Sequence, residues 1–238
     1  MERGSGVAMW RQIEDRMKED IVSGNWKPGD RLPTESELAE RFGVNRHTLR
    51  RALSALRDDG LVRIEQGRGT FVQDDVIDYA VRRRTRFSEN ISNLGRQPSG
   101  EVVRAETVAA DTQAASALEI RRGQKVVLLE LLSFVDGRPV SIGAHQFPQT
   151  RFRGLDKTYR ETGSITKALR QFGVDDYFRK LSRVSARLPE PEDAHLLNMA
   201  RAQPILYTES VNVDRDGKPI EYCIARYAGH RMQLVFEL

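Results

Sequence analysis

The sequence predicts an α+β protein in two parts, a small helical part followed by a larger part of paired strands with interspersed helices. Residues 9–58 carry apolar side chains at helical spacing, and two strand-hairpin patterns recur beyond residue 125. The chain has 238 residues, of which 39% are hydrophobic, and this is enough for two domains with real cores. We expect a first domain over 9–73, a linker over 74–84 and a second domain over 85–238.

Two short helices open the first part. Apolar residues recur at spacings of three, four and four between Trp10 and Ile21, which predicts a helix over 9–22. Thr34 followed by Glu37 forms a capping box, because each side chain can accept a hydrogen bond from the backbone N–H of the other residue. A second helix therefore begins after Thr34, and Gly43 ends it.

A third helix and a hairpin complete this part. Asn45 can cap the helix, and Asp59-Gly60 closes it. Short apolar runs at 61–64 and 70–72 flank Gln66-Gly67-Arg68-Gly69, and such a glycine-rich tip between two runs predicts a hairpin. Two helices joined by Gly43-Val44 and followed by this hairpin are typical of a winged helix-turn-helix, which binds DNA.

Arginines concentrate in the third helix and the hairpin. Residues 41–68 hold seven arginines against three acids, although the whole chain carries only +4. A local basic element of this kind is typical of phosphate binding. Since the third helix would enter the major groove N-terminus first, we expect Arg46 to pair with guanine and Thr48 and Arg51 to hold phosphates. Arg68 at the hairpin tip is expected to enter the minor groove.

Three segments resemble a known family. They are PGDRLPTE at 28–35, NRHTLRRAL at 45–53 and QGRGTFV at 66–72, and over residues 9–73 they look like the GntR family of bacterial transcription regulators. The resemblance implies a homodimer that binds a palindromic operator in double-stranded DNA. The residues that we expect at the DNA are Thr34, Ser36, Asn45, Arg46, His47, Thr48, Arg50, Arg51, Gly67, Arg68 and Gly69.

The second part contains two predicted hairpins. Apolar and β-branched residues fill 126–135 and 140–147, and Asp136-Gly137-Arg138-Pro139 joins them as a turn. The segments 207–213 and 220–227 repeat this arrangement around a second Asp-Gly turn. Together they predict an antiparallel sheet. Helical stretches are expected at Gln113–Leu118, Ile165–Phe172 and Glu192–Leu197.

This part resembles the UTRA sensor domain of the HutC branch of that family, a domain similar in fold to chorismate lyase. The similar segments are RFSEN at 86–90, the turn at 136–139, GSI at 163–165 and DGKPIEY at 216–222. The resemblance implies an effector-binding and dimerisation domain. With RVSAR at 183–187, the chain is most similar to PhnF-like regulators of phosphonate metabolism. This implies a ligand-responsive repressor of phosphonate uptake or catabolism whose effector is a small anion, a phosphonate or a phosphate ester.

Polar residues of the second part are the candidate effector ligands. Ser88 is expected to cap a helix that runs through Ile91, where its hydroxyl and the following amides would cradle a phosphate or phosphonate. Leu131 and Ser133 stand where family members that bind phosphorylated sugars usually have two arginines, and Gly143 replaces a common glutamate. These departures argue against a sugar phosphate. The candidate set is Arg86, Ser88, Ser133, His145, Ser164, Thr166, Glu221 and Tyr227.

Four of these candidates have an ordinary structural role as their alternative. Ser88 can be a helix cap and nothing more. His145 can be a satisfied or exposed histidine, and Glu221 can pair with a nearby arginine. Tyr227 can be sheet packing, and Cys223 is interpreted as a small core residue.

Other functions stay open at this point. In a chorismate-lyase-like fold Glu221 and His145 could act as acid and base, but we find no nucleophile–base motif, metal-ligand cluster or nucleotide loop. An architectural DNA binder would not need about 150 further residues. A HutC-type repressor of another small anion, a sugar phosphate or a carboxylate, is the nearer alternative. We therefore expect a regulator and not an enzyme.

The composition indicates the cellular compartment and excludes several kinds of site. No run approaches about 18 apolar residues, so no membrane span is expected, and the first residues lack the apolar core of an export signal. Cys223 is the only cysteine, which rules out an internal disulfide, leaves no cysteine-based zinc site and suits the cytoplasm. We expect no metal and no cofactor.

Overall fold

The chain divides after Asp75 into two compact units, which are described separately here. The structure, a computed structural model, describes residues 7–236. The division differs from the expected linker over 74–84. Strand β3 (Ile77–Val81) lies within that segment and pairs with a strand of the second unit, so most of the expected linker is part of the second unit's fold.

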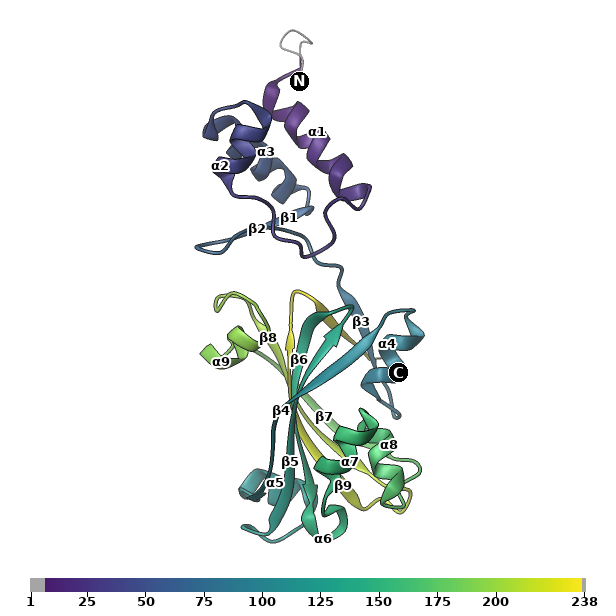
Figure 1. The fold of residues 1–238 in the computed structure, drawn as a ribbon. Coiled ribbons are helices and arrows are strands. Elements are labelled where there is room, and N and C mark those ends of the chain that lie inside the picture. Colours follow the sequence, from purple (N-terminus) through teal and green to yellow (C-terminus); the bar gives the residue numbers. More distant parts are fainter. Residues whose placement is uncertain (1–6, 237–238) are drawn as a thin grey trace. The chain divides into compact units, whose positions relative to one another are not determined.

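The first unit has the predicted winged helix-turn-helix architecture (Figure 1). Its helices are α1 (Met9–Val22), α2 (Glu35–Phe42) and α3 (Arg46–Asp58). Strands β1 (Val62–Glu65) and β2 (Gly69–Val72) pair antiparallel and form the wing. Helices α2 and α3 begin after the capping residues Thr34 and Asn45, whereas α1 begins after Ala8 without a side-chain cap.

Side-chain caps set the turn between α2 and α3. The backbone N–H of Glu37 donates to Oγ1 of Thr34 at 3.3 Å, and the backbone N–H of Thr34 donates to the Glu37 carboxylate at 2.7 Å. Gly43 ends α2 with φ of 64°, a left-handed conformation that glycine adopts without strain. The backbone N–H of Thr48 donates to Oδ1 of Asn45 at 2.8 Å and starts α3. The predicted capping box and Asn45 cap are confirmed.

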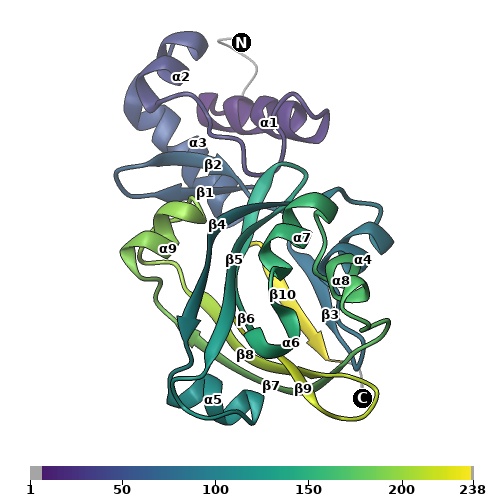
Figure 2. The same ribbon diagram turned by 60° about the horizontal axis from the view of Figure 1, so that its bottom comes forward.

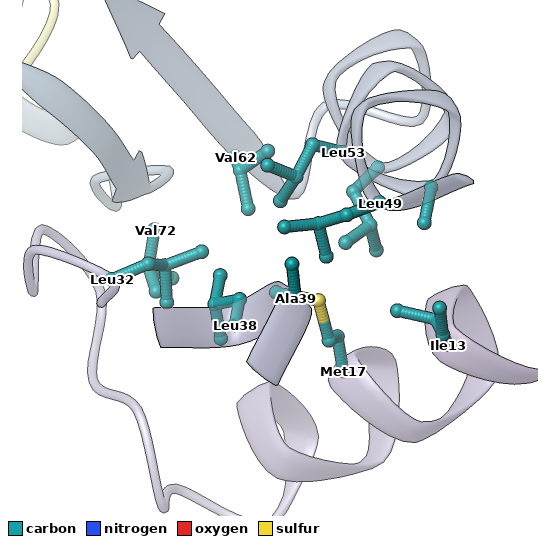
Figure 3. Close-up of a cluster of buried hydrophobic side chains, with 11 residues drawn as sticks. Ile13, Met17, Leu32, Leu38, Ala39, Leu49, Leu53, Val62 and Val72 are labelled. Atoms are coloured by element: carbon teal, nitrogen blue, oxygen red, sulfur yellow. The ribbon is translucent and has the colours of Figure 1, made fainter. Parts of the chain in front are cut away.

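One apolar core holds the first unit together (Figure 3). Ile13 and Met17 of α1 pack against Leu49 and Leu53 of α3, and Leu38 of α2 closes the other side. Burying side chains of this size contributes about 1.5–3 kcal/mol each, so these contacts dominate the stability of a unit of this size. The wing joins the same core through its first and last residues, Val62 and Val72.

The second unit is built on a six-stranded antiparallel sheet. The strand order is β4-β5-β6-β9-β8-β7, so each predicted hairpin supplies two adjacent strands. The central pairing of the two hairpins runs from Ser141 opposite Tyr227 to Gln146 opposite Tyr222. The strands are β4 (Pro98–Ala109), β5 (Lys125–Val135), β6 (Arg138–Pro148), β7 (Phe178–Arg187), β8 (Ile205–Val213) and β9 (Pro219–Ala228).

Helices cover both faces of this sheet (Figure 2). Helices α6 (Gln149–Phe152), α7 (Leu155–Thr162) and α8 (Ile165–Gln171) pack on one face against Leu129, Leu131 and Phe147. Helices α5 (Thr112–Leu118) and α9 (Pro191–Leu196) pack on the opposite face. The predicted helices at 113–118, 165–172 and 192–197 correspond to α5, α8 and α9.

A two-stranded parallel ribbon completes the second unit. Strand β3 pairs with β10 (Met232–Phe236), with Ile77 opposite Met232 and Val81 opposite Phe236. Helix α4 (Phe87–Asn93) packs beside the ribbon through Ile91. The residue that precedes α4 is Arg86, and it makes no side-chain cap. The prediction that Ser88 caps this helix is therefore wrong, because Ser88 already lies inside its first turn.

Among the described helices, none combines the length and the apolar character needed to cross a membrane.

Candidate functional site

The exposed start of α3 carries the residues predicted to contact DNA. Asn45, Arg46 and His47 are exposed, and Thr48 is half-buried. The guanidinium of Arg46 donates from Nη2 to Oγ of Ser36 on α2 at 2.9 Å, so its direction is set by the neighbouring helix. The Thr48 hydroxyl donates to Oδ1 of Asn45 at 3.0 Å. That oxygen is already used by the cap, so only the amide nitrogen of Asn45 is suited to a base or phosphate.

Two more arginines line the same helix with different surroundings. Nε of Arg50 donates to the Glu35 carboxylate at 2.7 Å. Arg51 lies over the ring of Trp10, with its guanidinium carbon 4.5 Å from the ring centroid. Both side chains are exposed and positioned before any ligand arrives. The hydroxyl of Thr34, by contrast, serves the capping box.

The wing tip is folded back on its own base. Arg68 donates from Nη1 to Oε2 of the buried Glu65 at 2.6 Å, and Arg63 donates to the other oxygen of the same carboxylate at 2.9 Å. The tip glycines have positive φ, 74° at Gly67 and 117° at Gly69. Arg68 is therefore held against the hairpin, and insertion into a minor groove would require it to leave Glu65.

The second unit contains a cavity of about 320 Å³ over one face of the sheet. All eight candidate effector residues line it: Arg86, Ser88, Ser133, His145, Ser164, Thr166, Glu221 and Tyr227. They come from α4, β5, β6, α8 and β9 and from the residues just before α4 and α8, which are distant in the sequence. The structure thus brings the whole predicted set around one space, and whether these residues touch a ligand stays a prediction.

The half-buried His145 and the buried Glu221 form an acid–base pair at the cavity. Nδ1 of His145 lies 2.5 Å from Oε1 of Glu221, and the Asn212 amide donates to Oε2 of the same carboxylate at 2.5 Å. Burial by itself would lower the pKa of His145, but the neighbouring Cys223 and Glu221 raise that pKa to about 10. Burial would raise the pKa of Glu221, and the hydrogen bond and charge of His145 lower it. Each residue of the pair therefore favours the charged form of the other.

The position of His145 depends on a glycine. A Cβ atom at position 143 would meet Nε2 of His145 at 2.6 Å, so the ring occupies the space that any side chain on Gly143 would need. Gly143 itself has ordinary strand geometry in β6 and pairs with Leu131 and Ala225. The departure from the common glutamate at position 143 is therefore what admits the imidazole.

A second ionic group, built on Arg86, also lines the cavity. Nη2 of Arg86 donates to Oδ1 of Asp176 at 2.7 Å, and its guanidinium carbon lies 4.6 Å from the ring centroid of Tyr177. Tyr177 hydroxyl lies 2.9 Å from Oγ1 of Thr166. Burial raises the pKa of Tyr177 to about 12, so the phenol stays protonated. Nε of Arg86 is buried without an acceptor among the described residues.

Sequence reasoning missed several polar residues of the cavity. Arg179 of β7 lines it, and its buried Nε also has no hydrogen-bond acceptor among the residues that the structure describes. Ser210 and Asn212 of β8 face the cavity together with Glu221. The alternation of side chains along β8, paired in register with β9, was the signal that would have found these two. Arg179 lies on an edge strand without an apolar pattern and gave no comparable signal.

The cavity also holds one cluster of possible metal ligands, and the expectation of no metal stays a prediction. His145, Glu221 and Cys223 bring one nitrogen, one carboxylate oxygen and one sulfur within 4.8 Å of one another. A single cysteine gives no sequence signal for such a cluster, which mixes three ligand types from two adjacent strands.

Two family models match the chain, one for each unit. The model of the bacterial regulatory proteins of the gntR family matches residues 10–72, and the UTRA domain model matches residues 93–233. The chain belongs to the GntR family and carries a UTRA domain. GntR proteins with this architecture are transcription regulators, so the alternative of an enzyme with a chorismate-lyase-like fold is set aside.

Relatives extend over almost the whole of this GntR chain. The transcriptional regulator RB1450 of Rhizobium meliloti is 40% identical and covers 100% of this chain and 98% of its own length. The probable transcriptional regulator PhnF of Escherichia coli is 30% identical over 96% of this chain and 94% of its own. The mannosyl-D-glycerate transport/metabolism system repressor MngR of the same species is also 30% identical, over 90% and 89%. The crystal structure of PhnF from Mycobacterium smegmatis superposes with a TM-score of 0.66 at 28% identity, covering 98% and 99% of the two chains.

Proposed function

We propose that this GntR-family regulator is a ligand-responsive repressor whose cavity binds a small anion of the phosphonate or phosphate-ester class. The observation that carries this proposal is the positive charge around the cavity. Arg86 and Arg179 line it, each with a buried Nε that has no acceptor among the described residues, and Lys167 and Arg170 stand exposed at the same cavity. A buried N–H donor without an acceptor costs about 1–3 kcal/mol, which an anionic ligand would recover.

Serine and threonine hydroxyls would complete the anion site. Ser88, Ser133, Ser164 and Thr166 line the cavity, and each hydroxyl can donate to a phosphonate oxygen. Leu131 and Ser133 stand where arginines occur in relatives that bind phosphorylated sugars, which favours a smaller anion over a sugar phosphate. The sensing of a different anion, a sugar phosphate or a carboxylate, is the second candidate. The Glu221–Asn212 pair favours it, because this pair can bind ligand hydroxyls.

In this proposal the chain segment that follows the first unit connects the cavity with the DNA-binding unit. The segment that follows the first unit enters β3 at Ile77, and three of its residues, Tyr79, Thr85 and Arg86, line the cavity. A ligand that moves this segment changes how the DNA-binding unit is tethered. Coupling between two such sites is typically worth about 1–3 kcal/mol.

The DNA-bound form in this proposal is a homodimer in the cytoplasm. Two copies of α3 would lie in successive major grooves about 34 Å apart on a palindromic operator. Arg46 would read a base, and the wing would contact the backbone or minor groove through Gly67, Arg68 and Gly69. Light scattering of the full chain with and without operator DNA measures the oligomeric state, and a monomer on the DNA would contradict this part.

A ligand screen with a matched pair of variants tests the effector. Thermal-shift and gel-shift measurements would compare 2-aminoethylphosphonate, methylphosphonate, glucosamine 6-phosphate, inorganic phosphate and a dicarboxylate. We expect a phosphonate to raise the melting temperature by the RT ln(1 + [L]/Kd) relation and to release the operator. Arg179→Met should abolish this response, whereas Arg183→Met, an exposed change on the same strand, should keep it. A response to glucosamine 6-phosphate alone would favour the second candidate, and no response to any anion would contradict both.

A further inference from the structure

We propose that His145, Glu221 and Cys223 form a binding site for a divalent transition-metal ion of the zinc type, inside the effector cavity. The three donor atoms lie within 4.8 Å of one another, and Glu221 and Cys223 are both buried. Nitrogen, oxygen and sulfur are the donor atoms that proteins use for Zn²⁺, at about 2.0–2.3 Å from the ion. The site goes beyond the proposed anion sensing, because no anion is needed for the ion to bind.

The backbone preorganises the three ligands. His145 of β6 lies directly opposite Cys223 of β9 in the central pairing of the sheet. Glu221 is two residues before Cys223 on the same strand and therefore projects from the same face. The absence of a side chain on Gly143 lets the imidazole lie down over its own strand, towards the carboxylate. No loop has to close to assemble the cluster, because its ligands stand on rigid central strands.

A second layer of contacts orients the carboxylate. The Asn212 amide donates to Oε2 of Glu221 at 2.5 Å, which leaves Oε1 on the side of His145. Ligands held in this way by a neighbouring hydrogen bond are the rule at metal sites, and loss of such a partner typically weakens metal binding about 10–100-fold. On binding, the ion replaces the proton between Nδ1 of His145 and Oε1 of Glu221, and the Cys223 thiol loses its proton to solvent.

The donor set selects the class of metal. Mg²⁺ and Ca²⁺ prefer oxygen-only ligands, whereas a thiolate with an imidazole selects Zn²⁺ or its neighbours in the first row. Three protein ligands leave a tetrahedral ion one open position. Since all three residues line the cavity, this position faces the space assigned to the effector. A bound ion would then offer a ligand anion a direct bond.

The single cysteine makes the test specific. Co²⁺ would be added to the untagged full chain, because a cobalt–thiolate bond gives a charge-transfer band in the near ultraviolet that only Cys223 can produce in this chain. We expect one band that saturates at one ion per chain and that Zn²⁺ displaces. In the unmodified protein, Zn²⁺ should also slow the reaction of Cys223 with a thiol reagent by at least 10-fold.

Two variants test two of the ligands, and a third variant is the control. Cys223→Ser should abolish the charge-transfer band, and His145→Gln should weaken Co²⁺ and Zn²⁺ binding by more than the roughly 10–100-fold that a supporting residue such as Asn212 contributes. The matched control is His195→Gln, an exposed histidine of α9, which should bind the ions unchanged. Circular dichroism without metal checks that each variant is folded.

The outcomes separate this site from the regulatory proposal. Absence of a charge-transfer band together with no protection of the thiol in the unmodified protein overturns the metal site. Zn²⁺ binding that survives in Cys223→Ser and disappears in His195→Gln overturns it as well, since it places the ion on the surface. Neither result uses DNA or an effector. The proposal of an anion-responsive repressor is therefore tested separately, by the ligand screen described above.

Discussion

The ring of His145 lies over Gly143 so closely that a Cβ at position 143 would fall 2.6 Å from Nε2. Gly143→Ala should therefore push the imidazole away from Glu221 and destabilise the second unit by about 1–3 kcal/mol, the usual cost of overpacking a core. Urea denaturation followed by fluorescence measures this. In a His145→Ala background the added methyl group has room, so the same Gly143→Ala change should cost less than about 0.5 kcal/mol. Equal costs in the two backgrounds would show that the glycine serves some other contact.

Arg46 is held by Ser36 at the exposed start of α3, and this geometry gives a sequence-specific prediction. Arg46→Ala should weaken operator binding by about 1–3 kcal/mol and relax the preference at one base position. Arg57→Ala is the matched control, because Arg57 lies exposed at the far end of the same helix beside Asp58. Gel shifts on the operator and on point-substituted operators measure both changes. An equal loss on random DNA would assign Arg46 to a phosphate.

Asn45 caps α3 through its side-chain oxygen, and its amide nitrogen is the atom that we propose contacts DNA. Asn45→Ala removes the oxygen that caps α3 and should lower the free energy of unfolding by about 1 kcal/mol. Asn45→Asp keeps the capping oxygen and should restore that stability, while its negative charge lowers affinity for DNA. Thermal denaturation and gel shifts of the two variants separate these effects. If Asn45→Asp bound the operator as well as the unmodified chain, Asn45 would lie away from the phosphates.

Asp176 should make the stability of the second unit depend on acid pH. Burial would raise the pKa of Asp176, but the hydrogen bond from Arg86 and the charges of Arg84 and Arg86 lower it below its usual value. A lowered pKa in the folded state stabilises the protein above the ordinary aspartate pKa of about 4, and this contribution is lost as pH falls through the folded-state pKa. Asp176→Asn should cost about 3 kcal/mol at neutral pH, because it leaves Arg86 buried without its anion.

The control for Asp176 is its exposed neighbour. Asp175→Asn should leave the free energy of unfolding within about 0.5 kcal/mol of the unmodified chain. The gap between the unmodified chain and Asp176→Asn should narrow as pH falls below about 4. A gap that stays constant with pH would mean that the Asp176 side chain acts by packing and not by charge.

Local signals in the sequence predicted the first unit well. Thr34 and Asn45 fix the starts of α2 and α3 through bonds that span only three residues, so the sequence alone contains the evidence. The glycine-rich tip at 66–69 likewise predicts the wing from residues that are close together in the sequence. The salt bridge between Arg68 and Glu65 was not foreseen, because a half-buried arginine folded onto its own hairpin leaves no periodic pattern.

The strands of the second unit's sheet were predicted only where they are buried. The four central strands are rich in apolar and β-branched residues and were found, whereas the edge strands β4 and β7 are largely exposed and carry charges along their length. Strand β3 was taken for a linker because its partner, β10, lies more than 150 residues away. The eight candidate residues at the cavity were predicted with the help of the family resemblance. Arg179 was not predicted, because its place at the cavity depends on the strand register that sets it opposite Asn212.

The parallel pairing of β3 with β10 sets an order for folding during synthesis. The first unit is compact and has its own core, so it can fold as soon as residues up to about Asp75 leave the ribosome. The second unit has to wait for Met232–Phe236, the strand that pairs with β3, and its nascent chain keeps Ile77 and Tyr79 uncovered until then. A ribosome-stalled chain that ends before β10 should therefore expose a folded DNA-binding unit followed by an incomplete sensor.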